Sequence, residues 1–320
     1  MLKEAHQDNY KIVIFTNQAG VKVGQITISD LRNKFVQIYN SLKIPFQFFC
    51  ATKTDENRKP GNGMWEHFIN NQNGNKVIDL EASFFWGKSA GRPKTDTKKK
   101  DFSDIDRKFA INCGLKFYTP EMYFLKTDET LPPLSFDIKK YKKPEPDEES
   151  KDKAIVNYKS NKQEIIVFVG APGSGKSTFW QNYLSDYIRV WTDVLKTKEK
   201  CLKACIEAID NGQNVVIDNT NPYKDTRASY TSIAKEKDIS IRCFYFDIEQ
   251  QLCMHNNRQR SINLHRKHLS KKVADMIIHT FYKRVESPSI DEGFSEVKNI
   301  EFTAGPFEND KDEQTYFSCS

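Results

Sequence analysis

The sequence lacks the usual signatures of membrane, secreted and zinc-binding proteins. No apolar run in its 320 residues is long enough to span a bilayer, and the first residues, Met-Leu-Lys-Glu-Ala-His, carry no hydrophobic signal segment. The seven cysteines are scattered, without a C-x-x-C pair or histidines at zinc-finger spacing. Cys201 and Cys205 share a helical face, where core packing is favoured over metal binding. We therefore expect an intracellular protein with reduced thiols and no membrane partner.

Charge and composition restrict the choice of partner only weakly. The net charge of +6 fits an acidic partner such as nucleic acid without requiring one. Residues 131–163 are dense in Pro, Lys, Glu and Asp and poor in apolar periodicity, which is typical of a linker. They predict two domains, 1–130 and 164–320, joined by a segment that is mobile or extended near Lys142–Lys153.

The run GAPGSGKST at residues 170–178 directly follows the apolar stretch 165–169. This order of strand, glycine-rich loop and helix predicts a P-loop, in which backbone N–H groups close around anionic oxygens. Lys176 would reach the β- and γ-phosphates and the Ser177 hydroxyl would hold Mg²⁺, so we expect ATP or GTP binding. A chance match and a P-loop that has lost its activity are the alternatives. The predicted nucleotide-binding residues are Gly170, Gly173, Ser174, Gly175, Lys176, Ser177 and Thr178.

Apolar runs and helical patterns alternate after the P-loop. This alternation predicts a doubly wound parallel α/β sheet, with ligands beyond the carboxyl ends of its strands. Asp193 and Asp218 each follow one of the predicted strands. Asp218 would support Mg²⁺ directly or through water, and Asp193 would accept a proton from an attacking hydroxyl. The alternative for each aspartate is a helix N-cap.

A basic helical stretch, 252–268, stands where many P-loop kinases carry a lid. Arginines such as Arg258 and Arg260 would close there on the γ-phosphate and neutralise charge that develops in the transition state. A solvated basic helix explains the same residues equally well.

Four runs in the C-terminal block, GAPGSGKST, TDVL, VVIDNTNP and HNNRQR, resemble in sequence and order the kinase domain of the polynucleotide kinase 3′-phosphatase family. The family's members are two-domain enzymes that repair DNA ends. The resemblance implies that Asp193 is the general base on a 5′-hydroxyl and that a lid arginine, Arg258 first and Arg260 second, contacts the phosphates. It also implies ATP and Mg²⁺ as cofactors, strand ends of DNA or RNA as partners, and a nuclear location.

The N-terminal block resembles the family's phosphatase domain. The run YKIVIFTNQ at residues 10–18 is similar to the second motif of haloacid-dehalogenase phosphatases, and RKP, GMW and DFS followed by DRKFA also match. The resemblance implies that Thr16 hydrogen-bonds the transferring phosphoryl group and that Lys59 balances its charge. The expected fold is an incomplete haloacid-dehalogenase-like, Rossmann-like domain followed by a P-loop kinase domain.

Two departures from the family pattern affect the phosphatase block. The D-x-D-G-T strand, whose first aspartate is the nucleophile, does not precede Tyr10, and Lys88 stands where the family has a metal-binding aspartate. Without a nucleophile, Thr16 and Lys59 only assist a reaction that another group must begin. We therefore expect a degenerate or truncated phosphatase domain without its first strand and without activity. A shortened start explains the missing strand but does not explain Lys88.

The basic run 92–100, with Arg107 and Lys108, is a candidate contact for backbone phosphates, and a solvated loop is an equal alternative. Phe84, Phe85 and Trp86 favour a buried strand over a base-stacking platform. The family's phosphopeptide-binding module is not in this sequence, so no repair-scaffold partner is inferred.

The leading hypothesis is an ATP-dependent polynucleotide 5′-hydroxyl kinase whose phosphatase activity is lost. One alternative is a P-loop kinase of a small metabolite, which the phosphatase-like N-terminal block disfavours. The other is a non-catalytic protein that binds strand ends, which the intact Lys176, Ser177, Asp193 and Asp218 disfavour.

Overall fold

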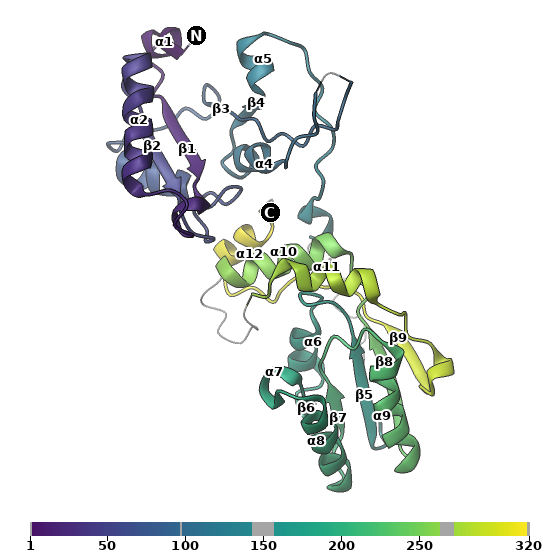
Figure 1. The fold of residues 1–320 in the computed structure, drawn as a ribbon. Coiled ribbons are helices and arrows are strands. Elements are labelled where there is room, and N and C mark those ends of the chain that lie inside the picture. Colours follow the sequence, from purple (N-terminus) through teal and green to yellow (C-terminus); the bar gives the residue numbers. More distant parts are fainter. Residues whose placement is uncertain (1, 97, 143–156, 263–271, 319–320) are drawn as a thin grey trace, which may run out of the picture. The chain divides into compact units, whose positions relative to one another are not determined.

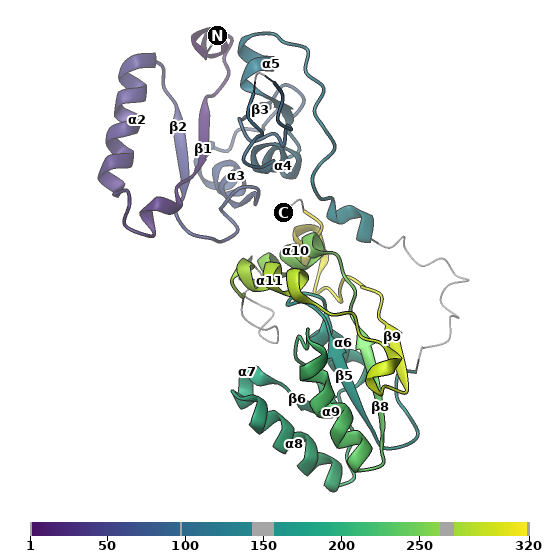
Figure 2. The same cartoon turned by 45° about the vertical axis from the view of Figure 1, so that its right-hand side comes forward.

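The computed structural model of the chain describes residues 2–96, 98–142, 157–262 and 272–318. The chain forms two compact units, which Figures 1 and 2 show in two views. Unit 1 comprises residues 1–140 and 309–320, and unit 2 comprises residues 141–308. The centre of the expected linker, 143–156, and the expected lid residues 265–268 lie outside the described residues.

The boundaries of the two units differ from the expected domain boundaries of 130 and 164. Two apolar side chains inside the expected linker, Phe136 and Ile138, are buried, and unit 1 extends to residue 140. The C-terminal residues group with unit 1 rather than with the kinase-like unit, and Tyr316 and Phe317 are buried there. The charged, proline-containing composition of residues 131–163 predicted a linker. The two buried apolar side chains within it were therefore not recognised as part of unit 1.

Unit 1 contains two separate parallel sheets of two strands each. β1 (Val13–Asn17) pairs with β2 (Gln47–Ala51), and β3 (Phe84–Trp86) pairs with β4 (Lys116–Tyr118). Both sheets pack on one core, in which the ring of Phe109 lies 5.4 Å from that of Phe15 and 5.0 Å from that of Phe85. Within the described residues β1 and β3 each pair on one side only, as expected for an incomplete haloacid-dehalogenase-like sheet.

The helices of unit 1 are short apart from α2 (Ile28–Leu42), which begins at a capping box. The Thr27 hydroxyl accepts a hydrogen bond from the backbone N–H of Asp30, and the Asp30 carboxylate accepts one from the backbone N–H of Thr27. Leu31 and Phe35 form the buried face of this helix. The other elements of unit 1 are α1 (Leu2–Gln7), η1 (Ala19–Val21), α3 (Gly63–His67), η2 (Phe68–Gln72), α4 (Ile105–Asn112), α5 (Pro120–Phe124), η3 (Ile138–Tyr141) and α12 (Asp310–Tyr316).

Unit 2 is built on a five-stranded sheet in the order β6-β7-β5-β8-β9, and every adjacent pair is parallel. This confirms the predicted parallel sheet of a P-loop kinase. The last strand, β9, was not predicted, because its sequence EVKN is short and mostly polar. The strands are β5 (Glu164–Val169), β6 (Ile188–Val190), β7 (Val215–Ile217), β8 (Ser240–Tyr245) and β9 (Glu296–Asn299). The helices are α6 (Lys176–Tyr183), α7 (Thr192–Leu195), α8 (Lys198–Asp210), α9 (Lys224–Glu236), α10 (Gln250–Ile262), α11 (Asp275–Arg284) and η5 (Ile290–Glu292).

Helices cover both faces of this sheet. Ile165 and Val167 of β5 belong to a core cluster that also contains buried residues of α8 and α9. On the opposite face the ring of Phe168 lies 5.9 Å from that of Phe179 in α6. Because side chains alternate along a strand, the continuous apolar run of β5 supplies both cores. Cys201 and Cys205 are buried in the first core, as predicted.

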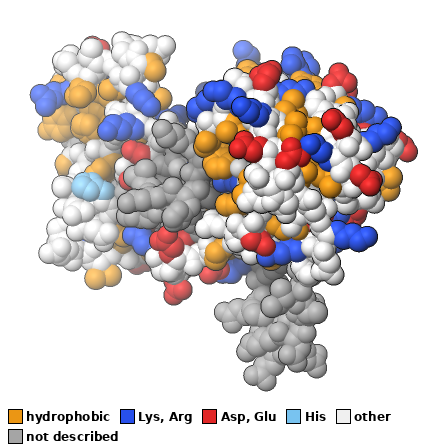
Figure 3. Space-filling model, turned by 90° about the horizontal axis from the view of Figure 1, so that it is seen from below, with side chains coloured by type: hydrophobic (Ala, Val, Ile, Leu, Met, Phe, Trp, Pro, Cys, Tyr) orange, Lys and Arg blue, Asp and Glu red, His pale blue; other side chains and the backbone are white. Residues whose placement is uncertain are grey.

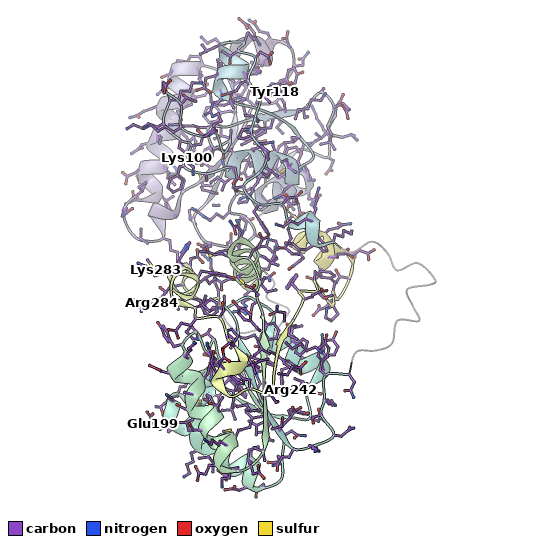
Figure 4. The ribbon with its side chains drawn as sticks, turned by 90° about the vertical axis from the view of Figure 1, so that its right-hand side faces the viewer. Lys100, Tyr118, Glu199, Arg242, Lys283 and Arg284 are labelled. Atoms are coloured by element: carbon purple, nitrogen blue, oxygen red, sulfur yellow. The ribbon has the colours of Figure 1, made fainter. Side chains whose placement is uncertain are left out.

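One charged residue of β5 is also buried. Glu164 is paired with Arg242 of β8, whose Nε and Nη2 lie 2.6 and 2.8 Å from the carboxylate oxygens. Arg242 is labelled in Figure 4. This pairing compensates the cost of burying the carboxylate. No described helix is both long and apolar enough to cross a membrane.

Candidate nucleotide and phosphoryl-transfer site

The loop between β5 and α6 has a backbone that only glycine can adopt without strain at two positions. Gly173 and Gly175 have φ values of +91° and +97°. A Cβ atom on Gly173 would lie 2.4 Å from the carbonyl oxygen of Cys253 in α10. A Cβ atom on Gly170 would lie 2.7 Å from the Ser174 hydroxyl oxygen. The loop therefore packs tightly against its own unit while its N–H groups lead into the first turn of α6.

Lys176 begins α6 and is 8% exposed. Its ammonium group donates to the carbonyl oxygens of Gly170 and Ala171, each at 2.8 Å. These acceptors are neutral, so its charge is not cancelled by a carboxylate in direct contact. Burial lowers the pKa of Lys176 to about 8, against the opposing attraction of Asp218. A buried cation with neutral partners is well prepared to bind an anion such as a phosphate group.

Ser177 and Asp218 lie together beside this lysine. The Ser177 hydroxyl donates to Asp218 Oδ2 at 3.0 Å, and Asp218 is 7% exposed at the carboxyl end of β7. A hydroxyl and a carboxylate oxygen are suitable ligands for Mg²⁺, whose remaining ligands are commonly phosphates and water. Arg189 of β6 also contacts both groups, with Nη2 2.7 Å from Ser177 Oγ and 2.5 Å from Asp218 Oδ2. The donor set therefore fits a magnesium ion once this guanidinium has moved.

Asp193 lies in the first turn of α7, next to the end of β6. The side-chain oxygen of Asn219 accepts hydrogen bonds from the backbone N–H and the hydroxyl of Thr192, at 2.8 and 2.9 Å. These bonds tie the start of α7 to the residue that follows Asp218. The N-cap of α7 is Trp191, not Asp193, and the carboxylate of Asp193 is exposed. This arrangement disfavours the N-cap alternative and leaves the carboxylate accessible to a hydroxyl group that enters from solvent.

Helix α10 contacts the P-loop and carries the predicted lid arginines. The amide group of Asn256 donates to the carbonyl oxygen of Gly173 at 2.8 Å. Asn257 exchanges two hydrogen bonds with the backbone of Val273, at 2.9 and 3.0 Å. Burial lowers the pKa of Arg260, while the negative charges of Asp193 and Asp218 oppose this shift.

Of the two candidate arginines, the structure relates Arg260 to the site. Both predicted carboxylates, Asp193 and Asp218, act on it, and its charge in turn lowers the pKa of Lys176. Arg258, the first choice from the sequence, is half-buried on the same helix.

The phosphatase-like residues meet in unit 1. The Asn17 side chain, at the end of β1, exchanges hydrogen bonds with the backbone of Lys59, at 2.9 and 3.0 Å. The hydroxyl of Thr16, one residue earlier, accepts a hydrogen bond from Gln18 at 2.9 Å. The ammonium group of Lys59 lies 2.6 Å from Asp106 Oδ1, and both side chains are largely buried. The charge of Lys59 is therefore already balanced within the chain.

Asp106 also organises the turn that contains Lys88. Its second oxygen accepts a hydrogen bond from the backbone N–H of Ser89 at 3.0 Å. A Cβ atom on Gly87 would lie 2.5 Å from the Asp106 side chain, so the turn requires glycine there. Lys88 itself is exposed.

The basic run 92–100 is less available for nucleic acid than its sequence suggests. Arg92 pairs with Asp101 at 2.9 Å and with Glu121 at 2.9 Å, and its side chain is 11% exposed. Lys108 is buried beside Asp104. Exposed lysines remain at positions 94 and 98–100. On the face of the molecule shown in Figure 3, Lys and Arg side chains are interspersed with Asp and Glu.

Comparison with known proteins addresses both units. Residues 1–124 match the family described as Polynucleotide kinase 3 phosphatase, and residues 165–283 match the family described as AAA domain. The bifunctional polynucleotide phosphatase/kinase of Schizosaccharomyces pombe is 38% identical over 304 residues, which cover 94% of this chain and 71% of the relative. The chain belongs to the bifunctional polynucleotide phosphatase/kinase family.

Two further relatives agree with this assignment. The homologue from Acanthamoeba polyphaga mimivirus is 34% identical over 328 residues, covering 94% of this chain and 77% of the relative. A polynucleotide 3′-phosphatase of Arabidopsis thaliana is 36% identical over 138 residues, covering 39% of this chain and 19% of the relative. In this phosphatase/kinase chain, unit 2 is the kinase unit and unit 1 is the phosphatase-like unit.

Each unit also contains residues next to its predicted site residues that the sequence analysis missed. Asn219 and Asn256 lie inside the runs VVIDNTNP and HNNRQR, so the resemblance contained a signal for both. Asp106 lies in the DRKFA run, where its pairing with Lys59 was not foreseen. Arg189 is a single arginine in a short strand, and nothing in its sequence neighbourhood marks it as a contact of Ser177 and Asp218.

Proposed function

We propose that this chain is an ATP-dependent 5′-hydroxyl kinase that acts, with Mg²⁺, on the strand ends of DNA or RNA. The observation that carries the proposal is the convergence of Lys176, Asp193 and Asp218 at the carboxyl ends of β5, β6 and β7. Ligands of parallel α/β sheets bind at this edge. Membership of a family named for polynucleotide phosphatase and kinase activity supports a strand end as the acceptor.

In the proposed reaction each residue has a separate role. The P-loop N–H groups and Lys176 bind the β- and γ-phosphates, and Ser177 and Asp218 hold the metal ion. When bound, the ion neutralises phosphate charge. Asp193 removes the proton from the 5′-hydroxyl, whose oxygen forms a bond to the γ-phosphorus while the bond to the β-phosphate oxygen breaks and ADP leaves.

Arg260, with Arg258 on the same helix, would neutralise the charge that develops on the transferring phosphoryl group. The exposed carboxylate of Asp193 suits this mechanism because the acceptor must reach it from solvent. The bonds from Thr192 to Asn219 hold this carboxylate near the nucleotide, since Asn219 directly follows Asp218. These contacts favour a catalytic site over a non-catalytic protein that binds strand ends.

We infer that residues 1–320 do not remove a 3′-phosphate. The printed sequence contains no D-x-D-G-T motif and has Lys88 at the position of the expected metal ligand. In the structure one carboxylate at this turn, Asp106, is engaged by Lys59 and by the backbone of Ser89. Its oxygens are therefore poorly placed to bind a metal ion. A nuclear location and a role in DNA-end repair complete the proposal and rest on the resemblance alone.

The test is transfer of label from γ-labelled ATP to a 5′-hydroxyl oligonucleotide, with Mg²⁺, by the full chain and two variants. Asp193→Asn should lower the rate by about 10²- to 10⁴-fold, the usual contribution of a general base. Asp225→Asn changes an exposed aspartate of α9 and should leave the rate unchanged. Unlabelled oligonucleotide with a 5′-hydroxyl should compete, and a 5′-phosphorylated one should not. Equal rates for both variants would contradict the proposed role of Asp193, and failure of any oligonucleotide to accept label would favour a metabolite kinase.

A further inference from the structure

Arg189 is the most unusual contact in unit 2, because it occupies the position between the two predicted metal ligands. Its Nε and Nη2 both donate to Asp218 Oδ2, at 2.8 and 2.5 Å, and Nη2 also donates to Ser177 Oγ at 2.7 Å. The arginine side chain is 17% exposed and that of Asp218 is 2% exposed. One guanidinium therefore satisfies both oxygens that would otherwise face a divalent cation.

The guanidinium also lies against two aromatic rings. Its central carbon lies 4.9 Å from the ring centre of Trp180 in α6 and 4.4 Å from that of Trp191. The indole N–H of Trp180 donates to the carbonyl oxygen of Tyr187 at 3.2 Å, which fixes that ring. Arginine stacks well on aromatic faces, and such contacts stabilise a desolvated cation. This stack distinguishes Arg189 from a surface ion pair formed by chance.

We propose that Arg189 is a built-in counter-ion that holds Ser177 and Asp218 in the nucleotide-free protein and must leave them before a magnesium–nucleotide complex can bind. The inference rests on the proposed function. Two cations cannot share one carboxylate oxygen at hydrogen-bond distance without strong repulsion. Arg189 therefore withdraws from Asp218 as the complex enters, and its movement changes the surroundings of Trp180 and Trp191.

The exchange sets how much Mg²⁺ the site requires. Arg189 stabilises the metal-free state through charge-assisted hydrogen bonds, and this stabilisation must be overcome whenever the metal ion binds. Trp191 immediately precedes Thr192 and Asp193, so displacement of the guanidinium is also felt at the proposed general base. Arg189 is a positioning residue in this scheme, because it acts through Ser177, Asp218 and Trp191.

The experiment titrates MgCl₂ into the full chain at fixed ADP, without any oligonucleotide, and follows tryptophan emission together with bound ADP. Emission of the unaltered chain should change when Mg²⁺ is added with ADP, and should stay constant when ADP is added in EDTA. Trp191→Phe should remove most of this change, which assigns it to the stack. Arg189→Gln should lower the Mg²⁺ concentration for half-saturation by about tenfold, the effect of losing one charge-assisted contact.

Arg189→Lys serves as the matched variant, because it keeps the charge but loses the paired hydrogen bonds and the planar stack. Its Mg²⁺ requirement should lie between those of the unaltered chain and Arg189→Gln. An unchanged or higher requirement in Arg189→Gln would overturn the inference and make Arg189 a supporting ligand of the bound complex. If Arg189→Gln does not fold, the Arg189→Lys titration and the EDTA comparison decide the question. A chain that shows the expected titrations but transfers no phosphate to a strand end would contradict the proposed function and leave this inference standing.

Discussion

Two lysines of this chain stand in motifs that are expected to bind a phosphoryl group. One has neutral hydrogen-bond partners and the other has a carboxylate partner. Lys176 in unit 2 is held by two backbone carbonyl oxygens, and burial lowers its pKa to about 8. Lys59 in unit 1 lies 2.6 Å from the carboxylate of Asp106. The first ammonium keeps a charge that an incoming anion can neutralise, whereas the second is already neutralised inside the protein.

The difference shows that a motif lysine indicates phosphate binding only when its charge is not already paired with a carboxylate. Both units retain a motif lysine, although unit 1 lacks the D-x-D-G-T motif of its family. In unit 2 the nearby carboxylate, Asp218, is bound by Ser177 and Arg189 rather than by Lys176. In unit 1 the carboxylate faces the lysine directly. The energetic balance of each site, and not its motif, decides whether it remains ready for a ligand.

The largest expected effect comes from exchanging the two lysines for an uncharged residue. Lys176→Met should lower phosphoryl transfer by about 10³-fold, because it removes a preorganised cation from the transferring phosphate. Lys59→Met should leave the transfer rate unchanged, because the charge of Lys59 is paired with Asp106. Initial rates with labelled ATP measure both. A similar loss of rate in the two variants would contradict the proposed difference between Lys176 and Lys59.

The second prediction concerns the stability of unit 1. Asp106→Asn leaves the buried ammonium of Lys59 without a compensating charge and should lower the free energy of unfolding by about 3 kcal/mol. Denaturant unfolding measures the change. Glu81→Gln removes the partner of Lys116 in an exposed pair and should cost about 0.5 kcal/mol or less. Equal effects would show that Lys59 and Asp106 behave as a surface pair.

The third prediction tests the packing of the P-loop. Gly173→Ala should destabilise unit 2 by more than about 2 kcal/mol, since its Cβ would collide with the carbonyl oxygen of Cys253 in addition to adopting a positive φ. Gly212→Ala also has a positive φ, at +75°, but meets no atom within 4 Å, so it should cost about 1 kcal/mol. Thermal unfolding of the two variants separates the collision from the strain. Equal losses of stability in the two variants would contradict the close contact between Gly173 and Cys253 of α10.

The smallest expected effect is a pH dependence of nucleotide binding. Because the pKa of Lys176 is lowered to about 8, the free protein loses this charge as the pH rises above 8. ADP affinity with Mg²⁺ should fall by about tenfold between pH 7 and pH 9. Lys176→Arg keeps its charge over this range and should show a flatter profile. A profile that is the same for both would mean that Lys176 stays protonated in the free protein.

The same pKa shift has the opposite effect on stability. Between pH 8 and the ordinary pKa of 10.5, the unfolded chain binds more protons at Lys176 than the folded chain does. The free energy of unfolding of the nucleotide-free protein should therefore rise with pH in this window. Unfolding curves without nucleotide provide the measurement. Lys176→Arg again gives the reference slope.

Much of the architecture was predictable because it depends on continuous or periodic apolar patterns. The apolar run 165–169 and the glycine loop after it predicted the P-loop, and the alternation that followed predicted the parallel sheet. The positions of Asp193 and Asp218 after their strands also followed from this topology. β9 was missed because its sequence is polar, and nothing in the local sequence pattern indicates that α12 groups with unit 1.

The contacts that distinguish the two sites were not predictable from one sequence. Arg189 meets Asp218 because β6 and β7 are neighbours in the sheet, and α6 brings Ser177 to the same place. The pairing of Lys59 with Asp106 joins residues 47 positions apart. Such side-chain partnerships depend on packing between elements, whereas motifs record only spacing along the chain.

The most direct test of the account follows both ends of one oligonucleotide in the same reaction. The substrate carries a 5′-hydroxyl and a 3′-phosphate, and the full chain is supplied with Mg²⁺ and γ-labelled ATP. We predict label at the 5′ end with the 3′-phosphate intact, because Lys176 is ready for phosphate and Lys59 is not. Removal of the 3′-phosphate, or an unlabelled 5′ end, would contradict the account.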